Sequence, residues 1–187
     1  MERPTTHEHQ AKRPAPQIYV ASLSDYNDGR LHGVWIDATD DPADIHDAIA
    51  AMLAASDDPG AEAYAIHDYS DFCGFAVSEF DEIDSVHKIA CGIAQHGEAF
   101  SVYVDLVGAD TATEENFNDS YHGSYPTFRA FADGFIESMG WDSEIERFGE
   151  QTGLGPFLTF DYDSFEATIR SEWSVMDERE DVHIFAP

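Results

Sequence analysis

Few residues of the chain have types and spacings that could support metal binding. Cys73, His87, Cys91 and His96 could each ligate zinc, and His87 and Cys91 share a face of an expected helix because they lie four residues apart. Their spacing matches no structural zinc pattern, and half-buried helix positions are the commoner role for such side chains. We therefore predict no metal site and no cofactor.

Residues for catalysis are equally hard to single out. The chain has 38 Asp and Glu, so carboxylate pairs occur by chance and none stands out as a general acid and base. The neighbours His67 and Asp68 lie in a β-rich run among aromatic residues, where a hydrogen-bonded structural role is the better interpretation. Asp161 and Asp163 lack the other positions of a calcium loop. The sequence contains no phosphate-binding loop, dinucleotide fingerprint, serine-hydrolase motif or zinc-protease motif, and it predicts a protein that is not an enzyme.

Charge is the dominant property of the sequence. The 38 acidic residues face nine Lys and Arg, which gives a formal charge of −29 over 187 residues, and fourteen acids lie between Leu31 and His87 without one Lys or Arg. The chain should nevertheless fold, because 43% of its residues are hydrophobic and 13% are aromatic. A chain of this sign is repelled by phosphates, so we expect no direct binding to nucleic acid. The same charge is carried by about 50 Å of DNA duplex, or roughly 15 base pairs.

Two explanations account for charge of a single sign. One is adaptation to a salty cytoplasm, and the other is a surface shaped to be bound by something basic. We expect a cytoplasmic protein without a membrane segment, because the sequence has no apolar run long enough for a membrane span or a secretory signal. Its two cysteines are too few for a disulfide framework.

The N-terminal half predicts a small sheet that carries one helix. Residues 1–16 are polar and proline-containing, and we expect a disordered extension there. The β-rich runs 17–22 and 31–37 indicate an antiparallel hairpin, and 62–69 can form a third strand. Asp41 before Pro42 begins a helix that reaches about Ala55. Residues 17–80 are therefore predicted to form an N-terminal β-β-α-β domain.

The remaining chain predicts a helical middle and a second α+β unit. In a mainly helical domain at 81–119, apolar residues recur at helical spacing from Ile83 to Ala94, whereas 98–107 fits either a helix or a strand. In a C-terminal domain at 120–187, the clearest amphipathic stripe runs from Phe128 to Met139 and ends at Gly140. Further segments of this domain are expected at 141–149, 157–162, 164–170, 173–176 and 182–185. The predicted fold class is α+β.

Four short runs of residues resemble one known family. They are 18–23 (IYVASL), 26–29 (YNDG), 33–37 (GVWID) and 63–69 (AYAIHDY), and they resemble the ArdA antirestriction proteins in order and spacing. The resemblance is specific over about residues 17–80. It is looser in the helix at 128–139 and in the segments 160–162 and 182–185, and the sixteen-residue extension departs from the family pattern.

The resemblance implies a non-enzymatic protein that mimics B-form DNA and occupies the DNA-binding groove of type I restriction-modification enzymes. Such proteins are carried by plasmids and conjugative transposons. The resemblance further implies an elongated chain of three small domains that forms a homodimer through the C-terminal domain. Residues 127–140 align with the family's antirestriction motif, near the dimer contact. The face of Phe128, Phe131 and Phe135 is thus a candidate dimer interface, with core packing as the alternative.

Our leading hypothesis from the sequence is therefore an antirestriction DNA mimic with carboxylates in place of phosphates. The alternatives are an acidic mimic that regulates another DNA-binding protein, and an acidic protein adapted to high salt. The candidate phosphate mimics are Asp57, Asp58, Glu62, Asp71, Glu79, Asp81, Glu82, Asp84, Glu98, Asp105, Asp110, Glu114, Glu115 and Asp119.

Overall fold

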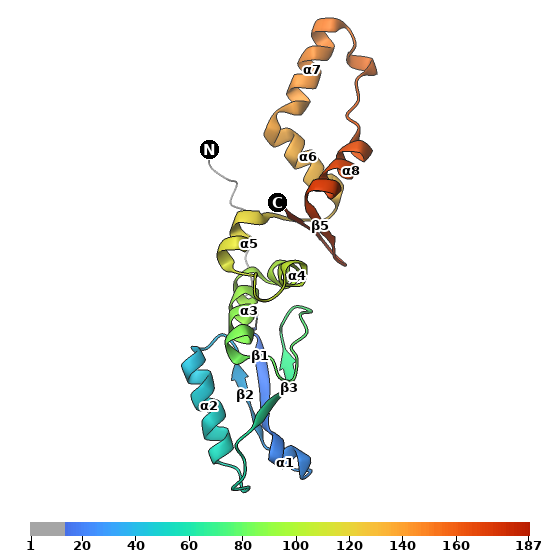
Figure 1. Ribbon diagram of the computed structural model, residues 1–187. Helices are drawn as coiled ribbons and strands as arrows, with labels where there is room; N and C mark the ends of the chain where they lie inside the picture. Colours follow the sequence, from blue (N-terminus) through green and yellow to red (C-terminus); the bar gives the residue numbers. More distant parts are fainter. Residues whose placement is uncertain (1–13) are drawn as a thin grey trace. The chain divides into compact units, whose positions relative to one another are not determined.

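The computed structural model describes residues 14–187, and the expected disordered extension lies mostly outside them. The chain divides into two compact units. We call the described residues 14–116 the N-terminal unit and residues 117–187 the C-terminal unit. Figure 1 shows the helices and strands of both. The division falls within one helix, and the domain boundaries expected after residues 80 and 119 stay predictions.

The N-terminal unit begins with a three-stranded antiparallel sheet of order β2-β1-β3. Its strands are β1 (Gln17–Ser22), β2 (Gly33–Asp37) and β3 (Tyr64–Ser70), and the short helix α1 (Leu23–Asn27) joins the first two. Tyr19 pairs with Asp68 while Val20 pairs with Ile66, so His67 is the extra residue of a β-bulge. The predicted hairpin and third strand are confirmed.

Helix α2 (Pro42–Ala54) packs against β1 and β2. Its first turn is capped by Asp41, whose carboxylate accepts a 2.9 Å hydrogen bond from the Ala43 amide, and Pro42 occupies the first helical position as predicted. Ile45, Ile49 and Met52 are its buried residues. The strands bury Ile18, Val20 and Ile36, so the core of this sheet is aliphatic.

Three helices follow in the middle of the chain, namely α3 (Ile83–His96), α4 (Glu98–Val107) and α5 (Glu114–Ser120). The segment that fitted a helix or a strand is the helix α4, in which residues 99–104 are all buried. The sequence was ambiguous because its β-branched valines suit a strand as well as a helix, and the helix buries Val102 and Val104. Helices α3 and α4 approach closely because Gly92 has no side chain, and a Cβ there would overlap the Phe100 ring.

The C-terminal unit contains a second antiparallel sheet, of order β4-β6-β5, with helices packed on it. Its elements are β4 (Tyr121–Tyr125), α6 (Phe128–Met139), α7 (Trp141–Thr152), the 3-10 helix η1 (Gly155–Phe157), α8 (Tyr162–Glu172), β5 (Ser174–Asp177) and β6 (Val182–Phe185). Thr127 caps α6 by accepting from the Ala130 amide at 3.1 Å. Gly140 ends it in the left-handed region at φ 70°, as its position predicted.

The fold class is α+β, as predicted. Strand β4 was not anticipated, because no strand was predicted at 121–125. The segment expected at 157–162 is not one continuous element, since η1 ends at Phe157 and α8 begins at Tyr162. No helix within residues 14–187 is both long enough and apolar enough to cross a membrane.

Candidate functional site

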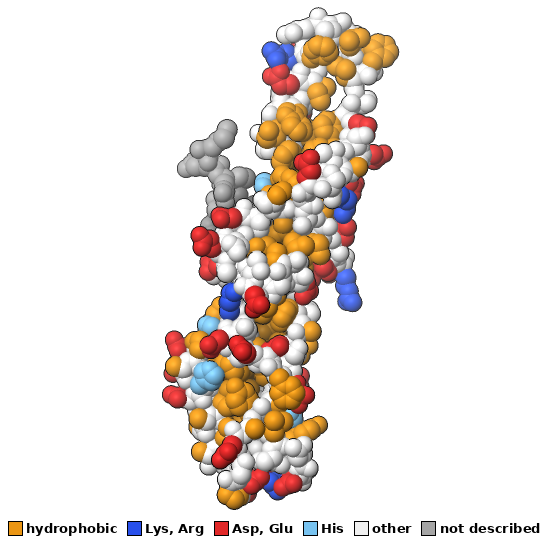
Figure 2. Space-filling view, in the orientation of Figure 1, with side chains coloured by type: hydrophobic (Ala, Val, Ile, Leu, Met, Phe, Trp, Pro, Cys, Tyr) orange, Lys and Arg blue, Asp and Glu red, His pale blue; other side chains and the backbone are white. Residues whose placement is uncertain are grey.

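The N-terminal unit has a surplus of carboxylates that its own cations do not balance. Residues 14–116 contain 21 acids and only two Lys or Arg, Arg30 and Lys88. Arg30 binds Asp25 at 2.8 Å and Asp28 at 3.3 Å, while Lys88 Nζ donates to the Ala109 carbonyl at 3.4 Å. Both cations are thus engaged. Figure 2 shows Asp and Glu side chains scattered over the face in view, with few Lys or Arg among them.

The fourteen predicted phosphate mimics all lie at the surface. Twelve are exposed, and only Asp58 and Asp81 are half-buried. Thirteen belong to the N-terminal unit, whereas Asp119 lies in the C-terminal unit. Asp57, Asp58 and Glu62 lie between α2 and β3; Asp71, Glu79, Asp81 and Glu82 between β3 and α3; Asp84 on α3; Glu98 and Asp105 on α4; Asp110 before α5; Glu114, Glu115 and Asp119 on α5.

Several of these carboxylates are held by local hydrogen bonds. Asp58 accepts from the Gly60 amide at 2.8 Å, and Asp81 accepts from the Ser78 amide at the same distance. Glu114 accepts from the Gln95 side-chain amide at 2.7 Å. These bonds fix turns and helix ends while the carboxylates stay at the surface, so part of the acidic surface is preorganised.

The packing of α2 near α3 adds acids that the sequence analysis did not select. His46 of α2 has its Nε2 3.7 Å from a carboxylate oxygen of Asp84 on α3. Asp44 and Asp47, also on α2, are exposed and belong to the same cation-free stretch. In the sequence, only their three-residue spacing on the polar face of a predicted helix indicated that Asp44 and Asp47 share one exposed face. Only the fold places this face near Asp84.

Asp25 is the one buried carboxylate within residues 14–187, and it supports the surface from within. Asp25 is 2% exposed and accepts from Ser56 Oγ at 2.6 Å and from Arg30 Nε at 2.8 Å. The hydrogen bonds from Ser56, Ser22 and Arg30 hold the pKa of Asp25 well below its usual range. Ser56 Oγ also accepts from the Asp58 amide at 3.0 Å, so Asp25 ties α1 to the turn that presents Asp57 and Asp58.

The side chains considered for metal binding do not converge within the described residues. His87 Nε2 and Cys91 Sγ are 3.7 Å apart, and His87 Nδ1 lies 3.1 Å from the Ala38 carbonyl oxygen. Burial raises the pKa of the Cys91 thiol, which keeps it protonated at neutral pH. Residues 14–187 contain no group of three or more His, Cys, Asp or Glu placed to hold a metal ion.

His67 packs against an aromatic ring instead of forming a polar pair with Asp68. Its ring meets Tyr26 edge-on with centroids 4.3 Å apart, and its Nε2 lies 4.0 Å from Glu79. Within residues 14–187 this Nε2 makes no hydrogen bond. Asp68 is exposed on the same strand.

The candidate dimer residues occupy the core of the C-terminal unit to different degrees. Phe128 and Phe131 are buried with Ala132, Ile169, Val182 and Ile184. Phe135 is half-buried and packs at the edge of this cluster, with its ring 5.8 Å from Trp141. The core-packing alternative therefore describes Phe128 and Phe131, and an interface role for this face stays a prediction.

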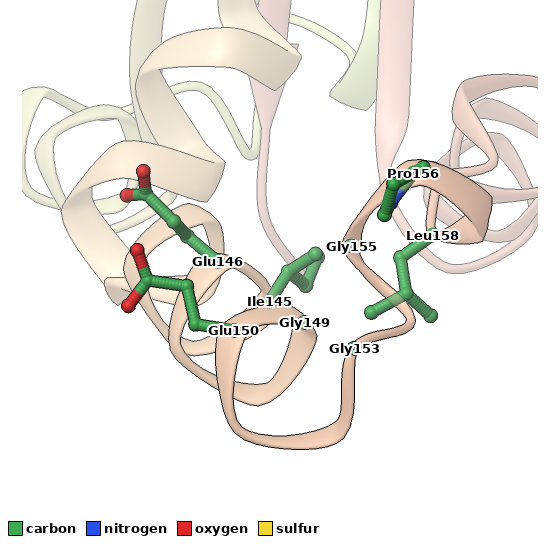
Figure 3. A pocket seen from close by; sticks show the side chains of 8 residues that line it. All are labelled: Ile145, Glu146, Gly149, Glu150, Gly153, Gly155, Pro156 and Leu158. Carbon is green, nitrogen blue, oxygen red and sulfur yellow. The ribbon is translucent and has the colours of Figure 1, made fainter.

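A shallow pocket of about 370 Å³ lies between α7 and η1 (Figure 3). Gly149 and Gly155 allow the two segments to touch, since a Cβ on Gly149 would lie 2.7 Å from the Gly155 Cα. Leu158 lines one side, and the carboxylates of Glu146 and Glu150 point away from it on the other. No predicted phosphate mimic lines this pocket.

Comparison with known protein families places the chain in one of them. A family model described as "Antirestriction protein (ArdA)" matches residues 18–177, which is most of the chain. No curated protein matches the sequence.

Proposed function

Because this chain belongs to the ArdA antirestriction family, we propose that it inhibits type I restriction-modification enzymes by presenting its surface carboxylates in place of DNA phosphates. ArdA proteins are non-enzymatic inhibitors, so the chain is an inhibitor and not an enzyme. A restriction-modification enzyme as the target follows from the family, whereas its type and the mimicry of B-form DNA are our proposal.

The acidic surface of the N-terminal unit is the observation that carries the proposal. Nineteen of its 21 acids have no Lys or Arg partner within residues 14–116, since Arg30 pairs with Asp25 and Asp28 alone. A DNA-binding groove supplies the Lys and Arg that this surface lacks. Phosphate contacts depend on charge and spacing more than on a particular side chain, so carboxylates scattered over several elements can replace them.

We further propose that two chains assemble through the C-terminal unit and act in the cytoplasm. Phe135 lies at the edge of the aromatic cluster, and Met139 and Trp141 next to it on the chain are 53% and 37% exposed. Two chains carry a formal charge of −58, equivalent to about 30 base pairs on the linear charge density of DNA. That length suits an enzyme that contacts DNA over a long site.

A competition assay tests this function. A type I enzyme with a labelled target duplex is titrated with the protein at about 0.1 M salt, and the titration is repeated at increasing salt. We expect displacement near one dimer per DNA site, fading as salt screens the charges. The control is an unrelated DNA-binding protein on a duplex labelled at its own site, titrated in the same way.

No displacement of the duplex across the salt series would contradict the proposal. A pull-down from a host lysate would then identify another DNA-binding protein as the target of the acidic surface, if one exists. Unfolding of the protein at 0.1 M salt would instead favour adaptation to high salt, since a mimic must be folded under the conditions of the assay.

A further inference from the structure

The outer face of the N-terminal sheet carries a row of two aromatic rings and a carboxylate. Trp35 of β2, Tyr19 of β1 and Asp68 of β3 lie directly opposite one another across the three strands. Side chains that are opposite in an antiparallel sheet project from the same face. This face is opposite to the one that buries Ile18 and Val20, because Tyr19 alternates with them along β1.

The row is open to solvent. Trp35 is 46% exposed, Asp68 is exposed and Tyr19 is half-buried. The two rings lie 5.4 Å apart at an angle of 48°. Tyr19 leans over Gly33, where a Cβ would meet its ring at 2.7 Å, so the glycine makes room for this arrangement. Solvated sheet faces normally carry polar side chains, and an exposed tryptophan there needs an explanation.

The C-terminal unit contains complete examples of the same combination. The Arg129 guanidinium lies 3.3 Å from the centroid of the Tyr162 ring, and its Nε donates to Asp133 at 3.0 Å. Hydrogen bonds from Tyr162 and Arg129 lower the pKa of Asp133. An aromatic ring and a carboxylate side by side thus hold an arginine from both directions in this chain.

A second arginine repeats the pattern in the C-terminal unit. The Arg170 guanidinium lies 5.5 Å from the centroid of the Phe128 ring, and Arg170 also donates to Asp177 at 2.9 Å. The two cation–π contacts found within residues 14–187 both lie in this unit. The row on the N-terminal sheet has the rings and the carboxylate, but no arginine of residues 14–187 is recorded over its rings.

An arginine for this row must come from outside the N-terminal unit. Its two cations are Arg30, which is paired with Asp25 and Asp28, and Lys88, which donates to the Ala109 carbonyl. The surplus of negative charge around the row attracts a cation and strengthens its binding over the rings.

We propose that Trp35, Tyr19 and Asp68 bind the guanidinium group of an arginine supplied by the protein whose DNA-binding groove the chain occupies. The inference rests on the proposed function, and it adds a specific contact to a surface otherwise recognised by charge alone. Arginine fits better than lysine, because its planar group stacks on a ring while it donates to a carboxylate.

The test uses Trp35→Thr, which keeps a strand-forming residue at an exposed position. Phe80→Thr removes an exposed aromatic residue outside the row and is the matched control, since Phe80 is 71% exposed. Thermal unfolding confirms that both variants fold. The probes are a blocked peptide with four arginines separated by glycines and its lysine counterpart, titrated at about 0.1 M salt. NMR follows the indole N–H signal of Trp35 in the proteins that contain it, and the backbone amide signals of β1 and β3 give the affinity of every variant.

We expect the arginine peptide to shift the Trp35 signal more than the lysine peptide does. Trp35→Thr should weaken its binding roughly two- to thirty-fold, the range of one cation–π contact, while Phe80→Thr changes little. Adding Asp68→Asn to Trp35→Thr should weaken binding of the arginine peptide further. An unmoved Trp35 signal, or equal affinity of Trp35→Thr and the wild type, would overturn the proposal.

Two further arms separate the possible failures. The same variants enter the enzyme competition assay, where equal inhibition by Trp35→Thr and the wild type also overturns the contact. If the wild type itself fails to displace DNA, the proposed function fails, and the peptide titration alone decides whether the row binds a guanidinium. A chain that begins at Pro14 lacks Arg3, Lys12 and Arg13. If that truncation alone moves the Trp35 signal, the chain's own segment occupies the row and an external arginine is excluded.

Discussion

The two units of this chain are both acidic, but they differ in how many arginines pair with their carboxylates. The N-terminal unit has 21 acids and two cations, and Arg30 forms its ion pairs with carboxylates. The C-terminal unit has 15 acids and four arginines, three of which pair with Asp or Glu. The two units therefore share the sign of their charge. The distinction lies in whether the chain supplies partners for its own acids.

The cores of the two units differ as well. Aliphatic side chains such as Ile18, Val20 and Ile45 fill the N-terminal sheet and α2, whereas aromatic rings dominate the C-terminal cluster. A large aromatic core can offset the repulsion of nearby acids, because each ring buries a large apolar area. Four sets of substitutions test this difference between the units, and they follow in order of decreasing expected effect.

Phe131→Ala should have the largest effect, on the stability of the C-terminal unit. Phe131 is 1% exposed and contacts the rings of Phe128, Phe135 and Trp173. Removing such a buried ring costs about 3–5 kcal/mol of unfolding free energy. Urea unfolding followed by tryptophan fluorescence measures the loss. Phe157→Ala, at an 81% exposed position, is the control, and an equal loss there would show that Phe131 has no special place in the core.

Neutralising acids of the N-terminal unit should weaken enzyme binding strongly. At about 0.5 kcal/mol per exposed carboxylate, six amide substitutions predict roughly a hundredfold loss in the competition assay. Asp58 and Asp81 are left intact because they bond to backbone amides. The six positions are Asp57, Glu62, Asp71, Glu79, Glu82 and Asp84.

The matched control removes six exposed acids from the C-terminal unit, so the net charge is the same in both variants. We expect less than a tenfold loss, since only long-range attraction changes. Equal losses in the two variants would mean that total charge decides binding, and the comparison between units would fail. The six control positions are Glu137, Glu146, Glu150, Glu172, Glu178 and Glu180.

Asp25→Asn should lower the thermal midpoint of the N-terminal unit by several degrees at neutral pH. The variant loses the charge that Arg30 and Ser56 stabilise. Since folding depresses the pKa of Asp25, its contribution to stability is full above the usual carboxyl pKa near 4 and declines as the pH falls below it. The difference between the melting curves of both proteins should therefore shrink steadily from about pH 4 toward pH 2. A constant difference across this range would contradict the assignment.

Arg129→Ala should have the smallest measurable effect, about 1 kcal/mol on the C-terminal unit, because it removes one ion pair and one cation–π contact. Arg147→Ala removes an exposed pair with Glu144, in which both side chains are more than 60% exposed, and should cost less than about 0.5 kcal/mol. Chemical unfolding of the two variants measures the difference. Equal costs would deny that the aromatic ring adds to the binding of an arginine, and would weaken the inference drawn for Trp35.

The sequence predicted the N-terminal fold well because its information there is local. Asp41 and Pro42 start α2, Gly97 separates α3 from α4, and strand runs are rich in β-branched and aromatic residues. Strand β4 was missed because YHGSY has little hydrophobic alternation, and its partner β6 lies about sixty residues further along the chain. Helix α4 stayed ambiguous because its valines are β-branched and occur in strands as readily as in buried helices.

The candidate site was predictable as a set of exposed acids and not as a surface. Lack of Lys and Arg between residues 31 and 87 is visible in the sequence, and so is the helix that carries Asp44 and Asp47. The neighbourhood of α2 and Asp84 depends on packing between segments about forty residues apart. The row of Trp35, Tyr19 and Asp68 depends on strand register, including the bulge at His67, which a sequence does not specify.

The cation-free stretch of the N-terminal unit also determines where proteases can cleave this protein. Trypsin cleaves after Lys and Arg, so it has no site between Arg30 and Lys88, and digestion of the unfolded chain releases residues 31–88 as one peptide. Lys88 lies within α3 and is half-buried, which protects its peptide bond while the helix is folded. Release of that peptide therefore reports the opening of α3 directly, whereas a glutamate-specific protease samples the exposed acidic surface.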